Sequence, residues 1–155
     1  GRREPRQGGA GHAPGTLPAG LADAPAPITA LAAQLLSAVG AVVTIDDEGL
    51  MDAVTAVSGS GPAYVFLLAE TMTDAGIAAG LPAALAKKLA EATVAGAGEM
   101  IALSDDSPLQ LRVNVTSRGG TTAAALAALM DDDGLAPLVK RAIMAARDRS
   151  IELGS

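Results

Sequence analysis

The sequence contains no cysteine and no tryptophan, and it has a single histidine, His12. The lack of cysteine excludes disulfides, thiol nucleophiles, iron–sulfur clusters and cysteine-based zinc sites. A single histidine also excludes multi-histidine metal sites and a conventional nucleophile–histidine triad. We therefore expect no metal site and no thiol or histidine-assisted nucleophilic chemistry.

Basic charge and aromatic side chains are also scarce. The 11 lysines and arginines against 17 aspartates and glutamates give a net charge of -6, which argues against a basic nucleic-acid surface. The two aromatic residues, Tyr64 and Phe66, offer no platform for stacking bases. The most apolar stretches, 63–69 and 123–130, end at acidic residues, far short of the roughly twenty residues that a bilayer requires. With no secretory signal either, we expect a cytoplasmic protein that binds neither nucleic acid nor membrane.

The composition divides the chain into a leader and one domain. Residues 1–27 consist almost wholly of glycine, alanine, proline and arginine, with prolines at positions 5, 14, 18, 25 and 27. A segment with so few apolar side chains cannot offset the entropy cost of ordering its backbone. We expect a disordered low-complexity leader over 1–27 and one helical domain over 28–155.

The first half of that domain shows helical patterns with one interruption. From Ile28, apolar residues recur at helical spacing as far as Gly40, a suitable C-cap. The β-branched run 41–45 predicts a short extended segment, and one strand cannot make a sheet. The acidic pair 46–47 then offers N-cap candidates for a helix through Val57.

Two long helices are predicted next. Pro62 suits the first turn of a helix running to about Gly80, and its residues are apolar on nearly every face, so we expect it to be buried. Leu81 and Pro82 open the second helix, with small residues at 95–98. Its stripe at heptad-like spacing is Leu85, Leu89, Ala92, Gly96, Met100 and Leu103. A chain of this size has little interior in which to enclose the apolar helix that starts at Pro62. We therefore expect a second copy to bury part of that helix in a homodimer.

The remaining residues are also helical in pattern. A short helix begins at Ser107 and Pro108, and a loop at 116–120 precedes a helix over 121–130. The break at 131–134 leads into a last helix with an apolar face and mostly opposite basic residues. The fold class that these patterns predict is all-α.

The segment 114–122, NVTSRGGTT, is the most informative for chemistry. Two glycines and several hydroxyl side chains precede a strongly helical run, so unpaired N–H groups and the positive end of a helix dipole converge there. This predicts a pocket for a carboxylate or phosphate oxygen, with the Thr122 hydroxyl donating to a second atom of the ligand. The alternative is that Thr116, Ser117 or Thr121 caps the helix and the glycines only make a turn.

Other candidate motifs favour structural explanations. The glycines at 58–61 and 96–98 lack the spacing and the βαβ context of a dinucleotide fingerprint, so close contact between helices explains them better. The contiguous aspartates 131–133 do not follow the alternating ligand pattern of a calcium loop. Glu70 and Asp74 share a helix face, which is typical of an exposed polar edge.

Four blocks of sequence together resemble a known family. They are DAVTAVSGSGPAYVFLLAE (52–70), AGIAAGLP (75–82), TVAGAGEM (93–100) and NVTSRGGTT (114–122). In order and spacing they are similar to the carboxy-terminal domain of pyrroline-5-carboxylate reductase, and the resemblance covers about 28–153. It implies a role in the NAD(P)H-dependent reduction of 1-pyrroline-5-carboxylate to L-proline. It also implies a domain that dimerises by interlocking its long helices and assembles further in some members.

The same resemblance implies roles for the loop before the helix at 121–130. The backbone around Ser117, Gly119 and Gly120 would hold the substrate carboxylate, and Thr122 would be the catalytic donor to the ring nitrogen. The full set of substrate-binding residues is then Val115, Ser117, Gly119, Gly120, Thr121 and Thr122. These roles agree with the predicted anion pocket and favour it over a simple helix cap.

The sequence departs from the family in three ways. The family's amino-terminal Rossmann domain is absent, so we expect NADP or NAD to serve the full-length family and no cofactor to bind this chain alone. Arg118 stands where the family usually has proline. Residues 1–27 do not resemble the preceding family segment, which fits a truncated or frame-shifted gene. We therefore expect the isolated chain to be inactive, and the alternative function is a non-catalytic helical homodimerisation module.

Overall fold

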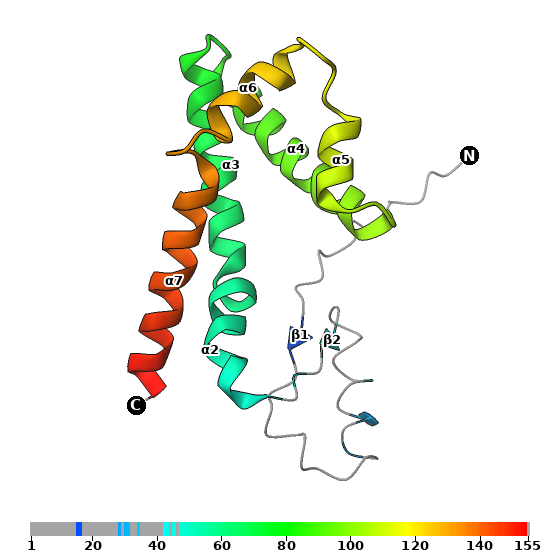
Figure 1. Ribbon diagram of the computed structural model, residues 1–155. Helices are drawn as coiled ribbons and strands as arrows, with labels where there is room; N and C mark the ends of the chain where they lie inside the picture. Colours follow the sequence, from blue (N-terminus) through cyan, green and yellow to red (C-terminus); the bar gives the residue numbers. More distant parts are fainter. Residues whose placement is uncertain are drawn as a thin grey trace, which may run out of the picture. The chain divides into compact units, whose positions relative to one another are not determined.

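The computed structural model describes residues 47–154 without a gap, together with 15–16, 28, 30–31, 34, 42–43 and 45. The chain divides into two compact units, Gly1–Val54 and Thr55–Ser155. Helices make up most of what is described (Figure 1). The predicted all-α class is confirmed, with one pair of two-residue strands as the exception.

The first unit contains that strand pair. β1, Gly15–Thr16, lies parallel to β2, Val42–Val43, and Gly15 is paired with Val42. The extended segment predicted within 41–45 is therefore present at β2. Helical backbone occurs at Ile28, Ala30, Leu31 and Gln34. The other residues of the predicted leader 1–27, and the predicted helix end at Gly40, lie outside the described residues.

The helix predicted after the acidic pair begins at the expected N-cap residue, Asp47. The Asp47 side chain accepts a hydrogen bond from the Gly49 N–H at 2.9 Å. The 3₁₀ turn η2, Glu48–Leu50, is followed by α2, Met51–Val54. In the second unit the chain continues as the π-helix η3, Thr55–Gly59. The helical stretch predicted through Val57 is confirmed, with Asp47 as its N-cap.

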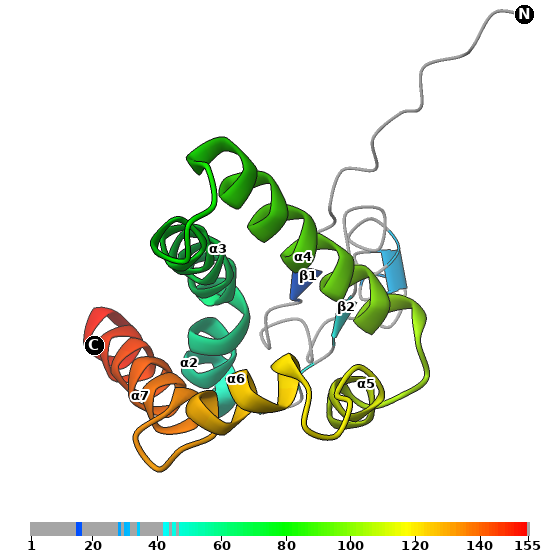
Figure 2. The same ribbon diagram turned by 90° about the horizontal axis from the view of Figure 1, so that it is seen from above.

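The second unit is organised around a hairpin of two long helices. α3, Gly61–Ala78, has proline in its first turn, and α4, Ala83–Leu103, follows after a short connection (Figures 1 and 2). Gly80 turns the chain at a φ of 102°, where only glycine is free of a Cβ penalty. The two helices approach closely at Gly76, where an added Cβ would lie 3.2 Å from the Ala86 Cβ.

The face of α4 that packs inward differs from the predicted stripe. The buried residues are Ala86 and Ala90, at 2% and 4% exposure. Large members of the predicted stripe are instead exposed: Leu85 44%, Leu89 48%, Met100 50% and Leu103 79%. Small side chains face α3 because only they allow the close approach at Gly76.

α3 presents a large apolar surface to its surroundings. Val65, Phe66, Leu67 and Leu68 are 45%, 66%, 58% and 46% exposed, although they occupy successive positions around the helix. A single chain therefore leaves this helix largely exposed, and its expected burial by a second copy stays a prediction. An apolar patch of this kind marks an interaction surface.

The other helices complete the unit. They are α5, Pro108–Asn114, α6, Thr121–Leu129, and α7, Leu135–Gly154. The predicted start at Ser107 is confirmed, since its Oγ accepts from the Gln110 N–H at 3.2 Å. α7 packs against η3 (Figure 1), where Ala56 is fully buried and its carbonyl accepts the Tyr64 hydroxyl at 3.0 Å. Over the described parts of the chain, the helices lack the combination of length and apolar character needed to cross a membrane.

The close packing at Gly76 can be tested with a branched side chain. We expect Gly76→Val to lower the free energy of unfolding by about 1–3 kcal/mol, because its side chain would overpack against Ala86 and Leu81. The neighbouring Ala75→Val is the matched control, because Ala75 is exposed on the same helix. Equilibrium urea unfolding measures both, and equal effects would contradict the close approach of α3 and α4.

Candidate functional site

The predicted site lies on the loop that joins α5 to α6. The Gly120 N–H donates to the Ser117 carbonyl at 3.2 Å, which closes a four-residue turn. Gly119 has a φ of 71° at the third position of that turn. A positive φ at this position alone is the signature of a type II turn, which leaves Arg118 at the second position. The predicted glycine turn is therefore present.

The start of α6 carries unused backbone donors. Gly120 is the N-cap and has no side chain with which to cap the helix. The first backbone hydrogen bond of this helix runs from the Ala124 N–H to the Gly120 carbonyl, at 3.2 Å. The N–H groups of Thr121, Thr122 and Ala123 precede that bond, and they find no acceptor within residues 47–154. These three groups have the arrangement that anion sites at helix N-termini use.

The alternative prediction, that a hydroxyl side chain caps α6, is wrong. The Thr116 hydroxyl donates to the Arg112 carbonyl of the preceding helix at 2.6 Å. The Ser117 hydroxyl approaches Gly120 so closely that a Cβ at that glycine would collide with it. Gly120 is thus needed for the approach of Ser117, and the helix start is left without a side-chain cap.

The predicted site residues differ in their surroundings. Val115 is 59% exposed, and Ser117, Gly119 and Thr121 are exposed as well. Gly120 and Thr122 are half-buried. The structure therefore places Ser117 and Gly119 of the turn at the surface, and Gly120 and Thr122 are partly covered.

Thr122 lines a cavity of about 320 Å³ formed by α4, α5 and α6. Its other lining residues are Ala97, Met100, Ile101, Pro108, Leu111, Arg112, Val115 and Leu126. Of the predicted site residues, Thr122 and Val115 share this cavity, and the other four are not among its lining. The walls are almost wholly apolar, so this hollow suits the methylene part of a small ligand.

Sequence reasoning missed Arg112 and the α4 contribution to this cavity. The Arg112 Nη1 donates to the Met130 Sδ at 2.7 Å, which holds the guanidinium across the end of α6. Met100 and Ile101 come from the end of α4, outside the motif 114–122. No local motif could reveal them, because the cavity exists only where three helices meet.

The arrangement can bind and orient a ligand with neutral donors. Backbone N–H groups at the helix start suit an anion, and the Thr122 hydroxyl supplies one further donor or acceptor. Among the described residues there is no cluster of three histidine, cysteine, aspartate or glutamate side chains that could hold a metal ion. In the aspartate run 131–133, the Asp131 carboxylate accepts from the Asp132 N–H at 2.9 Å.

Comparisons with protein families and with curated proteins identify the same family. A family model described as pyrroline-5-carboxylate reductase dimerisation matches residues 48–153. The pyrroline-5-carboxylate reductase of Synechocystis sp. is 50% identical over 125 residues, which are 81% of this chain and 46% of that protein. That of Pseudomonas aeruginosa is 51% identical over 122 residues, 79% of this chain and 44% of that protein. The chain spans somewhat less than half the length of these relatives.

Solved structures that resemble this chain belong to the same family of enzymes. The pyrroline-5-carboxylate reductase of Coxiella burnetii superposes with a TM-score of 0.79 at 39% identity, over 83% of this chain and 47% of that one. The pyrroline carboxylate reductase of Plasmodium falciparum, solved with NADP bound, superposes with a TM-score of 0.74 at 35% identity, over 86% of this chain and 53% of that one. The helical arrangement described above is therefore shared with these enzymes.

The turn at Gly119 provides a test of the loop geometry. We expect Gly119→Ala to lower the free energy of unfolding by about 1–2 kcal/mol, because a side chain at positive φ is strained. Gly96→Ala is the matched control: its added methyl meets nothing within 4 Å on α4 and should stabilise by about 0.5–1 kcal/mol. Urea unfolding of both variants measures the difference, and an unstrained Gly119→Ala would rule out the type II turn.

Proposed function

Because the chain belongs to the pyrroline-5-carboxylate reductase dimerisation family, we propose that two copies form a homodimer in which each copy supplies half of a reductase substrate site. The reaction is the NAD(P)H-dependent reduction of 1-pyrroline-5-carboxylate to L-proline. The exposed apolar surface of α3 supports the dimer, because a second copy would cover it. Dimers of this kind can assemble further.

The substrate carboxylate is held at the start of α6. The observation that carries this proposal is the N-cap Gly120, which leaves the N–H groups of Thr121, Thr122 and Ala123 without acceptors in residues 47–154. The backbone around Ser117 and Gly119 shapes the turn beside these donors. A carboxylate placed there receives several hydrogen bonds and lies at the positive end of the helix dipole.

Thr122 places the ring of the substrate. Thr122 belongs to the first turn of α6 and lines the apolar cavity with Val115 and Leu126. In the proposed complex the hydroxyl donates to the ring nitrogen and the ring methylenes occupy the cavity. Reduction adds a hydride to the carbon of the C=N bond and a proton to the nitrogen, so a donor on the nitrogen favours the transfer.

The nicotinamide nucleotide comes from outside these helices. The glycine-rich segment 58–61 joins η3 to α3, and the glycines at 96–98 lie in the interior of α4. Neither begins a helix after a parallel strand, as the dinucleotide fingerprint requires. We therefore infer that a separate domain presents NADP or NAD to the ring held at Thr122, and that this chain alone binds neither.

Arg118 gives weight to a second function, a non-catalytic homodimerisation module. The second position of a type II turn favours proline, because its fixed φ preorganises the turn. Arginine occupies that position here and leaves the loop less constrained. A chain that keeps its helical surfaces but loses ligand binding would be such a module.

Calorimetric titration of the 155-residue chain separates these functions. We expect L-proline and cyclopentanecarboxylate to bind, because both carry the carboxylate and only the first carries the nitrogen. Thr122→Val should weaken L-proline binding about fivefold, the effect of one lost hydrogen bond, and leave cyclopentanecarboxylate unchanged. Thr93→Val is the control, because that hydroxyl donates to the Leu89 carbonyl at 2.8 Å on α4. A parent chain that binds neither ligand would contradict the substrate half-site and favour the module.

The proposal that a separate domain presents the nucleotide gives a second expectation. The chain mixed with 1-pyrroline-5-carboxylate and NADPH should show no loss of NADPH absorbance above the buffer rate. Hydride transfer requires the nicotinamide held within contact distance of the imine carbon, and the helices offer nothing to hold it. The reductase of Pseudomonas aeruginosa is the positive control. Turnover by the chain at a rate comparable with this control would show that it carries a complete site.

A further inference from the structure

Charge is distributed unevenly along the chain. Segment 107–130, which contains α5, α6 and the loop between them, has two arginines and no aspartate or glutamate, whereas the whole chain has a net charge of -6. A small anion is therefore repelled by the protein as a whole and attracted to this segment. The substrate half-site proposed above lies within the segment, so its local charge suits a carboxylate ligand.

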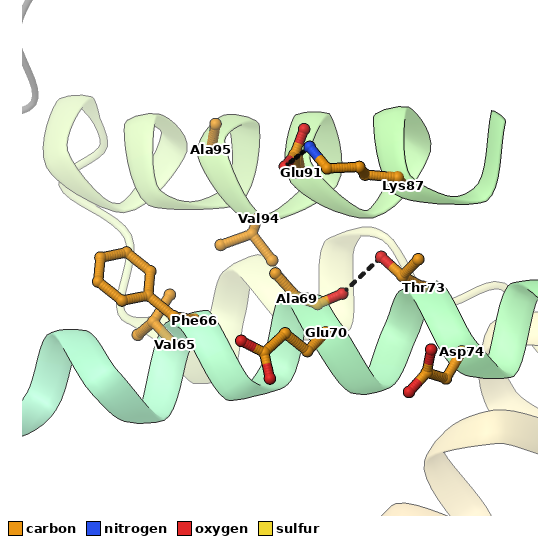
Figure 3. Close-up of a pocket in the computed structure, with 10 residues that line it drawn as sticks. All are labelled: Val65, Phe66, Ala69, Glu70, Thr73, Asp74, Lys87, Glu91, Val94 and Ala95. Atoms are coloured by element: carbon orange, nitrogen blue, oxygen red, sulfur yellow. Dashed lines mark hydrogen bonds and ion pairs between the residues drawn. The ribbon is translucent and has the colours of Figure 1, made fainter. Parts of the chain in front are cut away.

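A larger cavity in the second unit has the opposite charge. It has a volume of about 620 Å³ and lies between α3 and α4 (Figure 3). The carboxylates of Glu70 and Asp74 line it, and the Lys87 ammonium there is paired with Glu91. A carboxylate ligand would meet like charge in this cavity. Charge therefore favours the region of the α5–α6 loop for an anion, although the cavity beside that loop is smaller.

The two arginines of segment 107–130 differ in what their guanidinium groups already contact. Arg112 is half-buried, and its Nη1 donates to the Met130 Sδ at 2.7 Å. Arg118 is exposed and forms no ion pair with another residue of 47–154. A guanidinium carries five N–H donors in a planar fork that matches the two oxygens of a carboxylate. Arg118 therefore has the donors for such a ligand.

The turn places Arg118 close to the start of α6. A turn of this kind brings its first and last Cα atoms within about 7 Å of each other, and its last residue, Gly120, is the N-cap of α6. The long stem of an arginine at the second position can carry its charged head to the space in front of the Thr121 and Thr122 N–H groups. Proline, which this position favours, would fix φ and would bring no donor.

We propose that Arg118 is a carboxylate-binding residue of the substrate half-site. Its guanidinium closes over the ligand carboxylate from the solvent side, and the N–H groups at the start of α6 hold the carboxylate from the protein side. This inference rests on the half-site proposed above. The backbone donors are neutral and supply geometry, whereas Arg118 supplies a full charge. Binding to this chain should therefore depend on salt more strongly than backbone donors alone would allow.

The size of the effect follows from the exposure of Arg118. An ion pair that water can reach contributes little, because screening and the loss of side-chain freedom offset most of the attraction. Bidentate geometry makes an arginine–carboxylate pair one of the stronger cases. We expect a contribution of about fivefold in affinity at low salt. Arg118 thus acts on the capture of the anion and takes no part in the proton transfer at the ring nitrogen.

Calorimetric titration of the 155-residue chain at two salt concentrations tests the role of Arg118. Arg118→Gln should raise the Kd of cyclopentanecarboxylate about fivefold at low salt and less than about twofold near 1 M sodium chloride, where the Debye length is about 3 Å. L-proline should respond in the same way, because both ligands carry the carboxylate. Chloride that competes for the N–H groups affects parent and variant alike, so the ratio of their Kd values isolates Arg118.

Three further variants separate charge from loop conformation. Arg118→Lys keeps the charge and loses the planar fork, so it should bind with intermediate affinity. Arg118→Pro preorganises the turn, and it should show the weak salt dependence of Arg118→Gln whichever way its affinity moves. Lys88→Gln is the matched control, because Lys88 is an exposed cation of α4 that lines neither cavity. It should leave both Kd values unchanged.

The outcomes separate this inference from the half-site on which it rests. A parent chain that binds neither ligand overturns the half-site, and the role of Arg118 with it. A parent chain that binds, with an Arg118→Gln variant that binds equally well, overturns only the role of Arg118. Weaker binding that keeps the salt dependence of the parent, or an equal loss in Lys88→Gln, overturns it as well. A loss at low salt that shrinks at high salt, with Lys88→Gln unaffected, supports it.

Discussion

The structure depends on how the apolar surface of α3 is covered. A helix that is apolar on all faces is stable in water only when other elements surround it. Within the described part of the second unit, the buried apolar residues are three alanines, Ala56, Ala86 and Ala90. Alanines bury little area, so the hydrophobic free energy available to one chain is small. A second surface packed against α3 would supply the missing burial and would link folding to association.

The hairpin also decides where the loop between α5 and α6 can lie. α4 continues beyond the contact at Gly76, and its far end provides Met100 and Ile101 as one wall of the cavity beside Thr122. α5 and α6 provide the other walls. The loop 115–120 is thus held between two helix ends, which gives the N–H groups at the start of α6 a defined geometry.

Local chemistry in the sequence was sufficient to predict most helix ends. Asp47 and Ser107 have side chains that cap a helix start, and Gly80 has the positive φ that ends one. The heptad spacing in α4 shows which residues share a face, and it does not show which face meets α3. Its leucines are exposed, and the pair of alanines packs inside.

At the candidate site, too, the sequence predicted the local features and did not predict the tertiary contacts. The motif 114–122 was sufficient to predict a glycine turn and a helix start, because both depend on residues next to one another. It did not distinguish a capped helix from an uncapped one, which depends on the direction that the Ser117 and Thr116 hydroxyls take. Arg112 and the α4 wall could not be predicted at all, since only tertiary packing brings them to Thr122.

Tyr64 has a consequence for spectroscopy. The chain has no tryptophan and no other tyrosine, so fluorescence excited at wavelengths that phenylalanine does not absorb originates in this one phenol. Its hydroxyl donates to the Ala56 carbonyl at the junction of η3 and α3, at 3.0 Å. The emission of an unlabelled sample therefore reports on that junction alone, and the protein carries its own site-specific optical probe next to the surface that α3 exposes.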